Sequence, residues 1–148
     1  MKHYKVNAME NHLKSEENMW GSQRDHFLPF IYSNVFVIWS RLNDRRYNSF
    51  LRIEKGDTLH LLKPKTKKRK VYYTGTVLSD LIIDDEYTFS KNILLWNWEE
   101  INKKQEHIGK KEMKYIVEWE KQPYPDDELY EKIMEGYNAQ SVKEIYLE

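Results

Sequence analysis

Short apolar runs separated by polar and charged segments fill most of the chain, and this pattern predicts strands more than long helices. Residues 34–40 are rich in β-branched and aromatic side chains, which is typical of a buried strand. Residues 58–62 and 71–78 are also strand-like, and the Lys-rich segment 63–70 between them is expected to be an exposed hairpin connection. Gly75, inside the later strand, predicts a bulge or a close backbone approach.

Two more strands and two helices are expected in the rest of the chain. The strands are 93–98 and 113–119, the second with a clean alternation of apolar and polar positions. A helix is expected near 44–54, because apolar residues recur there at helical spacing and Gly56 can end it. A second helix is expected to start at Pro125 and to run to about Met134, because proline and acids suit a first helical turn.

The organisation along the chain favours a single domain. Residues 1–33 show no sustained period, so we expect a tail and an irregular packing segment there, followed by a domain over 34–148. A chain of 148 residues is long enough to bury a core without disulfides or metal.

The formal net charge of zero hides an uneven distribution. Residues 41–70 carry eleven Lys or Arg against three acids, whereas residues 118–148 carry nine acids against three Lys. The first segment suits a polyanion such as nucleic acid. The acidic C-terminal region suits a protein partner.

The sequence lacks the motifs that are typical of several classes of protein. No apolar run approaches the roughly 20 residues that span a bilayer, and no secretory signal is recognisable, so an intracellular protein is expected that binds no membrane. The absence of Cys excludes thiolate catalysis and Cys-ligated zinc. The five His have no metal-ligand spacing, and no P-loop or nucleophile elbow is present. We therefore expect no enzyme activity, no metal and no cofactor.

Two segments carry a resemblance to known families. In residues 39–57 a Trp precedes a helical pattern ending in Phe50-Leu-Arg52, then a Lys-Gly-Asp turn and a strand, which is similar to the EVE family. In residues 114–129 an alternating strand with Trp119 runs into a proline-containing loop and a helix, which resembles the YTH family. Both families have PUA-like folds. The resemblance implies an α+β protein with a PUA-like small β-barrel flanked by helices.

The sequence departs from the EVE pattern at its start. An EVE domain usually opens with a strand ending in Lys-Ser-Glu-Pro, whereas the nearest counterpart here is Ile38-Trp-Ser40. Two registers follow. Either Trp39 ends the first strand, as in the YTH family, or it is the Trp before the EVE helix, with residues 30–33 nearer the missing strand. Both registers place Trp39 near the pocket.

EVE and YTH domains hold a flipped, usually methylated base in an aromatic cage, so the resemblance implies such a cage here. The chain order of the YTH family matches Trp39 as one wall and Trp96 or Trp98 as another. Stacking contributes about 1–3 kcal/mol per base. The structural alternative is that any single Trp in a small barrel belongs to the core, which we expect for Trp119 at the end of its alternating strand.

Polar side chains just after the first strand are the expected contacts of the base edge: Ser40, Asn43 and Asp44. An amide or carboxylate there can discriminate among bases by hydrogen bonding. The alternative role of Asn43 or Asp44 is to cap the following helix.

Six cations in the predicted hairpin connection are expected to contact phosphates without reading sequence: Lys63, Lys65, Lys67, Lys68, Arg69 and Lys70. Arg41 and Arg45 are expected to extend this basic face. The alternatives for the hairpin are a nuclear-localisation patch or a solvated loop.

These features together predict a reader of a modified, typically methylated, or flipped base in RNA or DNA. The alternative is a non-catalytic protein-interaction module on the same fold, which would use the acidic C-terminal region. ASCH domains, which are PUA-like relatives, include proposed hydrolases, so a hydrolytic role also stays open.

Overall fold

The computed structural model describes residues 1–8, 27–41, 45–67, 69–135 and 142–147. Its strands are β1 (His3–Val6), β2 (Val35–Ser40), β3 (Thr58–Leu62), β4 (Tyr72–Val77), β5 (Ile82–Asp84), β6 (Lys111–Gln122) and β7 (Val142–Ile145). Its helices are α1 (Phe27–Ser33), a 3₁₀ turn (Arg45–Tyr47), α2 (Asn48–Leu51), a π-helix (Phe89–Ile93), α3 (Trp98–Lys104) and α4 (Asp127–Met134).

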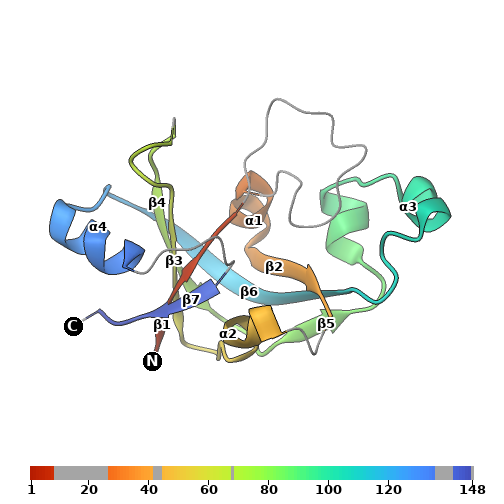
Figure 1. The fold of residues 1–148 in the computed structure, drawn as a ribbon, viewed down its shortest axis with the longest axis horizontal. Helices are drawn as coiled ribbons and strands as arrows, with labels where there is room; N and C mark the ends of the chain where they lie inside the picture. Colours follow the sequence, from red (N-terminus) through yellow and green to blue (C-terminus); the bar gives the residue numbers. More distant parts are fainter. Residues whose placement is uncertain (9–26, 42–44, 68, 136–141, 148) are drawn as a thin grey trace.

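The fold is α+β, with a mixed and strongly curled sheet that forms a half-barrel (Figure 1). Within the described residues, six strands follow the order β2-β6-β4-β3-β1-β7, and β5 also pairs with β6. The pair β1–β3 is parallel, whereas the other pairs are antiparallel. The long strand β6 pairs with β2 along its first half and with β4 along its second half, so it joins β2 and β5 to the other strands.

Two apolar clusters hold the sheet. The larger one includes Tyr4, Phe36 and Leu59, all fully buried. The smaller one lies under α4, where Ile133 packs with side chains of β3, β4 and β7. Each face of the sheet is therefore partly covered. Polar residues on the short strands can be buried as a result.

Several predicted elements are confirmed. The strand expected at 34–40 is β2, the strands at 58–62 and 71–78 are β3 and β4, and the strand at 113–119 is the centre of β6. The helix expected after Pro125 is α4, and the side chain of Asp126 caps it by accepting from the Leu129 amide at 2.9 Å. Segment 63–70 connects the antiparallel strands β3 and β4, as expected for a hairpin.

Gly75 marks a close approach, one of the two expectations for it. A Cβ at this position would clash with Cγ1 of Val117 and would lie 2.8 Å from Cε3 of Trp119. The absence of a side chain at residue 75 thus lets the Trp119 ring lie close against β4.

Other expectations differ from the structure. The strand expected at 93–98 is wrong, because the π-helix ends at Ile93 and α3 begins at Trp98. The helix expected near 44–54 is shorter and consists of the 3₁₀ turn and α2. Residues 1–33 are not all irregular, since they include β1, which pairs with β3 and β7, and the helix α1.

None of the helices in the part of the chain that the structure covers has the length and apolar character needed to cross a membrane.

Candidate functional site

Two of the three predicted cage residues lie against each other. Trp39 comes from β2 and Trp96 from the link between the π-helix and α3, and their ring centroids are 5.3 Å apart with planes inclined by 33°. Phe89 of the π-helix lies 6.3 Å from Trp39 by the same measure. Both Trp side chains are only 5% exposed. The fold thus gathers aromatic rings from distant segments, and these rings fill the space between them.

A buried carboxylate fixes the Trp39 ring. Glu112 is the partner of Trp39 across the β2–β6 pair and is fully buried. The indole Nε1 of Trp39 donates to Ser90 Oγ at 2.9 Å and to Glu112 Oε1 at 3.2 Å. Glu112 also accepts from the amides of Phe89 and Ser90, each at 3.0 Å, and from the Ser90 hydroxyl at 2.5 Å. This network ties β2, β6 and the π-helix together beside the Trp pair.

The segment carrying Trp96 is short and has an unusual backbone. Leu95 has a φ of 53°, in the left-handed region, and its side chain is 77% exposed. The Trp96 amide donates to the Ser90 carbonyl at 3.0 Å, and the Asn97 side chain caps α3 by accepting from the Glu100 amide at 3.2 Å. Trp96 is therefore held by one end of the π-helix and by the start of α3.

The third predicted cage residue, Trp98, belongs to a different aromatic group. Its ring centroid lies 4.8 Å from that of Tyr87 and 5.5 Å from that of His107, and the Lys91 ammonium lies 4.8 Å from its ring centre. Nδ1 of His107 is a buried atom without a hydrogen-bond partner in the described structure. Trp98 is half-buried, so this group is more open than the Trp39–Trp96 pair.

Of the three predicted base-edge residues, the structure describes only Ser40. Ser40 is buried at the end of β2, and its hydroxyl donates to the Arg41 carbonyl at 3.3 Å. Asn43 and Asp44 lie outside the described residues. Trp119 is half-buried against the larger cluster, as expected, and its Nε1 donates to the Val35 carbonyl at 3.0 Å.

The hairpin cations fall into two groups. Lys63 donates to the Ala8 carbonyl and lies 4.7 Å from the Phe27 ring centre. Lys65 forms an ion pair with Asp127 and lies 4.6 Å from the Tyr130 ring centre. These two lysines are therefore already engaged with their own chain.

The remaining described cations lie on the surface. The side chains of Lys67, Arg69 and Lys70 are exposed, with Arg69 5.8 Å from the Phe27 ring centre. Arg41 and Arg45 are also exposed. Lys68 lies outside the residues that the structure describes.

Comparisons with protein-family models, curated proteins and solved structures find no match. The site must therefore be judged on its own geometry. Among the described residues, no group of three or more His, Asp or Glu side chains is placed to hold a metal ion.

The arrangement can offer aromatic surface, but not an open slot. A base held between two rings lies one stacking distance from each ring, so the two rings must be two stacking distances apart. Trp39 and Trp96 are in direct contact, only one stacking distance apart, so no base fits between them in this arrangement. Since Glu112 and Ser90 hold Trp39, entry of a base between the rings requires Trp96 to move.

Sequence reasoning missed the residues that support this pair, above all Glu112 and Ser90. One signal was present: Glu112 is an acid directly before the apolar alternation of β6. Its meaning depends on the pairing of β6 with β2, which the sequence pattern does not specify.

Proposed function

We propose that the protein binds a modified or flipped base of RNA or DNA at the Trp39–Trp96 pair, on a PUA-like barrel of the EVE and YTH type. The exposed hairpin cations contact the phosphate backbone. The curled half-barrel supports this fold assignment, as does the passage from β6 through a proline-containing loop to α4. The expected register in which Trp39 ends a strand agrees with β2.

The observation that carries the proposal is the meeting of Trp39 and Trp96 beside a buried carboxylate. A base that leaves its stack loses stacking and pairing, and aromatic faces offset that loss. The indole N–H of any buried Trp needs an acceptor, and here Glu112 and Ser90 supply acceptors and fix the orientation of the Trp39 ring. A fixed ring is the preorganised wall that a base-stacking site needs.

Trp96 is the wall that moves. Its link carries the exposed Leu95 with positive φ, and it follows a π-helix, a rare element that is frequent at functional sites. Displacing the Trp96 ring opens one face of Trp39 to a base, while the Glu112 network keeps that face in place.

The test compares short oligonucleotides that differ only in one methylated base, as RNA and as DNA, by fluorescence titration. We expect tighter binding of one methylated form, with quenching of Trp emission. Trp96→Ala should weaken this binding about 5- to 150-fold, the range expected for the loss of one stacking wall. Equal affinity for methylated and unmodified oligonucleotides would refute the proposal.

The variant of Trp39 must separate binding from folding. Trp39→Ala removes a buried ring and should cost about 3–5 kcal/mol of stability. Trp39→Phe keeps an aromatic face and is the better probe of stacking strength. The matched control is Trp119→Phe, which changes a half-buried indole that the proposal places outside the site.

A specific observation also favours a second function, a protein-interaction module. Large apolar side chains around the same segment are exposed: Leu95 is 77%, Ile108 61% and Ile93 47% exposed. We propose that these side chains form an apolar patch, because such patches mark interaction sites. The test is Leu95→Asp combined with Ile93→Asp: an unchanged affinity for the methylated oligonucleotide, together with loss of a protein partner, would favour this second function.

A further inference from the structure

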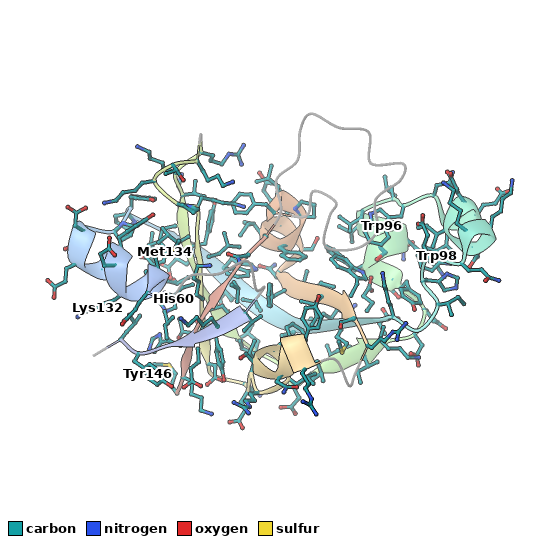
Figure 2. The ribbon with its side chains drawn as sticks, in the orientation of Figure 1. His60, Trp96, Trp98, Lys132, Met134 and Tyr146 are labelled. Atoms are coloured by element: carbon teal, nitrogen blue, oxygen red, sulfur yellow. The ribbon has the colours of Figure 1, made fainter. Side chains whose placement is uncertain are left out.

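Leu95 is a large apolar side chain that the link to α3 presents to solvent. It is 77% exposed, whereas the adjacent Trp96 is 5% exposed, so the link turns one side chain outwards and the next inwards. Figure 2 shows Trp96 and Trp98 at the end of the molecule formed by the π-helix and α3, away from α4. The exposed leucine therefore lies directly beside Trp96, the wall that moves.

The backbone at Leu95 ends the π-helix. Its φ of 53° is in the left-handed region, and the Trp96 amide closes the turn by donating to the Ser90 carbonyl at 3.0 Å. Glycine, and sometimes asparagine, is usual at such a helix end, because most side chains are strained at positive φ. The helix end thus explains the backbone conformation, but it does not explain the choice of leucine.

The other non-glycine residues with positive φ in the described part of the chain have ordinary roles. Asn34 follows α1 and Gln105 ends α3, and both side chains are polar, while the Tyr87 ring is buried. Leu95 combines a strained backbone with an exposed apolar side chain, and each is unfavourable in the free protein. The combination indicates that this side chain contacts a partner molecule.

We propose that Leu95 is a wedge that enters a base stack, so that the Trp39–Trp96 site takes its base from a duplex. This substrate class rests on the proposed function. Extruding a base from a duplex breaks stacking and pairing, and apolar side chains inserted between base steps offset part of that loss by burying their surface. Consecutive Cα atoms lie about 3.8 Å apart, close to the rise of about 3.4 Å between stacked bases. When Trp96 contacts the extruded base, Leu95 is thus about one base step from the gap.

Charged side chains near the link suit a polyanion. Lys91 on the π-helix and Arg41 directly after β2 are exposed cations. Cations of this kind hold the phosphate backbone and position a duplex without reading its sequence. Glu100 of α3 is an acid in the same region, and it forms an ion pair with Lys104.

The experiment compares paired and unpaired forms of the same strand. Each methylated oligonucleotide used to test base binding is annealed to its complement, with the fluorescent base 2-aminopurine as the neighbour of the methylated base. The emission of 2-aminopurine rises when it loses its stacking neighbour, so it reports entry of a wedge. We expect the wild-type protein to bind the duplex and to raise this emission.

The variants assign the effect to Leu95. Leu95→Asn removes the apolar side chain and suits positive φ, so its melting temperature should equal or exceed that of the wild type. It should bind the methylated single strand as the wild type does, but the duplex about 10- to 150-fold more weakly, as expected for the lost burial of one leucine. The rise in emission should disappear with it.

Two further variants separate a wedge from general apolar contact. Leu95→Met keeps a long apolar side chain and should retain most of the duplex affinity and the rise in emission. Ile108→Asn is the matched control, because it removes another exposed apolar side chain, which is 61% exposed. This variant should bind the duplex as the wild type does.

Three results would overturn the wedge: no rise in emission with the wild type, equal duplex affinity in the wild type and Leu95→Asn, or an equal loss in Ile108→Asn. Failure of base recognition is a separate result. A protein that does not prefer methylated single strands, but raises the emission through Leu95, keeps the wedge and loses the Trp39–Trp96 site. A protein that prefers them, but binds the duplex equally well as Leu95→Asn, keeps the Trp39–Trp96 site and loses the wedge.

Discussion

The indole Nε1 of Trp39 lies 3.2 Å from Oε1 of Glu112, its direct partner across the β2–β6 pair. The same carboxylate accepts from two amides and a hydroxyl of the π-helix. One buried acid therefore positions both the Trp39 ring and the segment that leads to Trp96. The orientation of the aromatic pair depends on this acid as much as on apolar packing.

Glu112→Gln should destabilise the protein by about 2–4 kcal/mol. The amide replaces one oxygen acceptor by an NH₂ donor, which then faces other donors in a buried site, and such unsatisfied groups are costly. Urea unfolding measures the change. Glu118→Gln, on an exposed position of the same strand, should change stability by less than about 0.5 kcal/mol. A small and equal effect of both substitutions would show that the carboxylate network is unimportant for the fold.

Gly75→Ala should cost about 1–3 kcal/mol, because the new methyl group overlaps Val117 and presses on the Trp119 ring. Thermal unfolding measures it against Thr76→Ala, a neighbouring exposed position on β4. If Gly75→Ala melts like the wild type, the ring of Trp119 is free to shift away from β4.

The elements that sequence predicted are those whose own residues carry the full signal. In β6 the alternation of Met113, Tyr115 and Val117 is enough to predict a strand, and at α4 Asp126 supplies the cap. The prediction failed at 93–98, because its apolar side chains hid the capping signal of Asn97, followed by two acids in the first turn of α3. With Trp96 and Trp98 on either side of the capping residue Asn97, the run shows neither the two-residue period of a strand nor the 3.6-residue period of a helix.

The strand β1 and the candidate site were harder to predict, because both depend on contacts between distant segments of the chain. β1 was missed because its sequence shows only four alternating residues, and its place in the sheet depends on pairing with the distant strands β3 and β7. The Trp39–Trp96 contact was expected from the family order of Trp residues. The direct contact of the two rings, which leaves no gap for a base, and the role of Glu112 both follow from strand pairing. No local sequence pattern encodes that pairing.

Acid should destabilise the protein through His60. Burial, and then the charge effect of His3, lower the pKa of folded His60 to about 4 from 6.5, so protons bind the unfolded state more tightly. The stability that neutral His60 contributes is fully present above pH 6.5 and is lost as the pH falls towards 4. The wild type should therefore lose about 3 kcal/mol more than His60→Gln between about pH 7 and pH 4.

Urea unfolding of both proteins across this pH range tests the His60 prediction. Carboxylates titrate alike in the two proteins, so their contribution cancels in the difference. Lys5 is charged in both the folded and the unfolded state well below its folded pKa of about 7, so it adds little slope at the acid end. Parallel stability profiles would mean that His60 accepts a proton in the folded state, with His3 or Tyr72 adjusting its hydrogen bond.

The hairpin between β3 and β4 should supply salt-dependent affinity without selectivity if the protein binds a base at the Trp pair. Changing Lys67, Arg69 and Lys70 together to Gln should weaken methylated and unmodified oligonucleotides alike. Removing one phosphate contact should reduce the slope of log affinity against log salt by about 0.7–0.9. Selectivity for the methylated base should survive, because exposed side chains reach the backbone of any sequence, whereas a methyl group is recognised only in a desolvated aromatic site.

The structure offers a matched control within the same hairpin. Lys65 and Lys67 are both exposed, but Lys65 is paired with Asp127 and lies over the Tyr130 ring. A cation already held by a carboxylate releases fewer counterions from a phosphate, so Lys65→Gln should change the salt slope less than Lys67→Gln. Equal slopes for these two variants and the wild type would identify the hairpin as a solvated loop. A triple variant that loses selectivity but keeps overall affinity would instead place the hairpin at the base, and the Trp39–Trp96 pair would then be core.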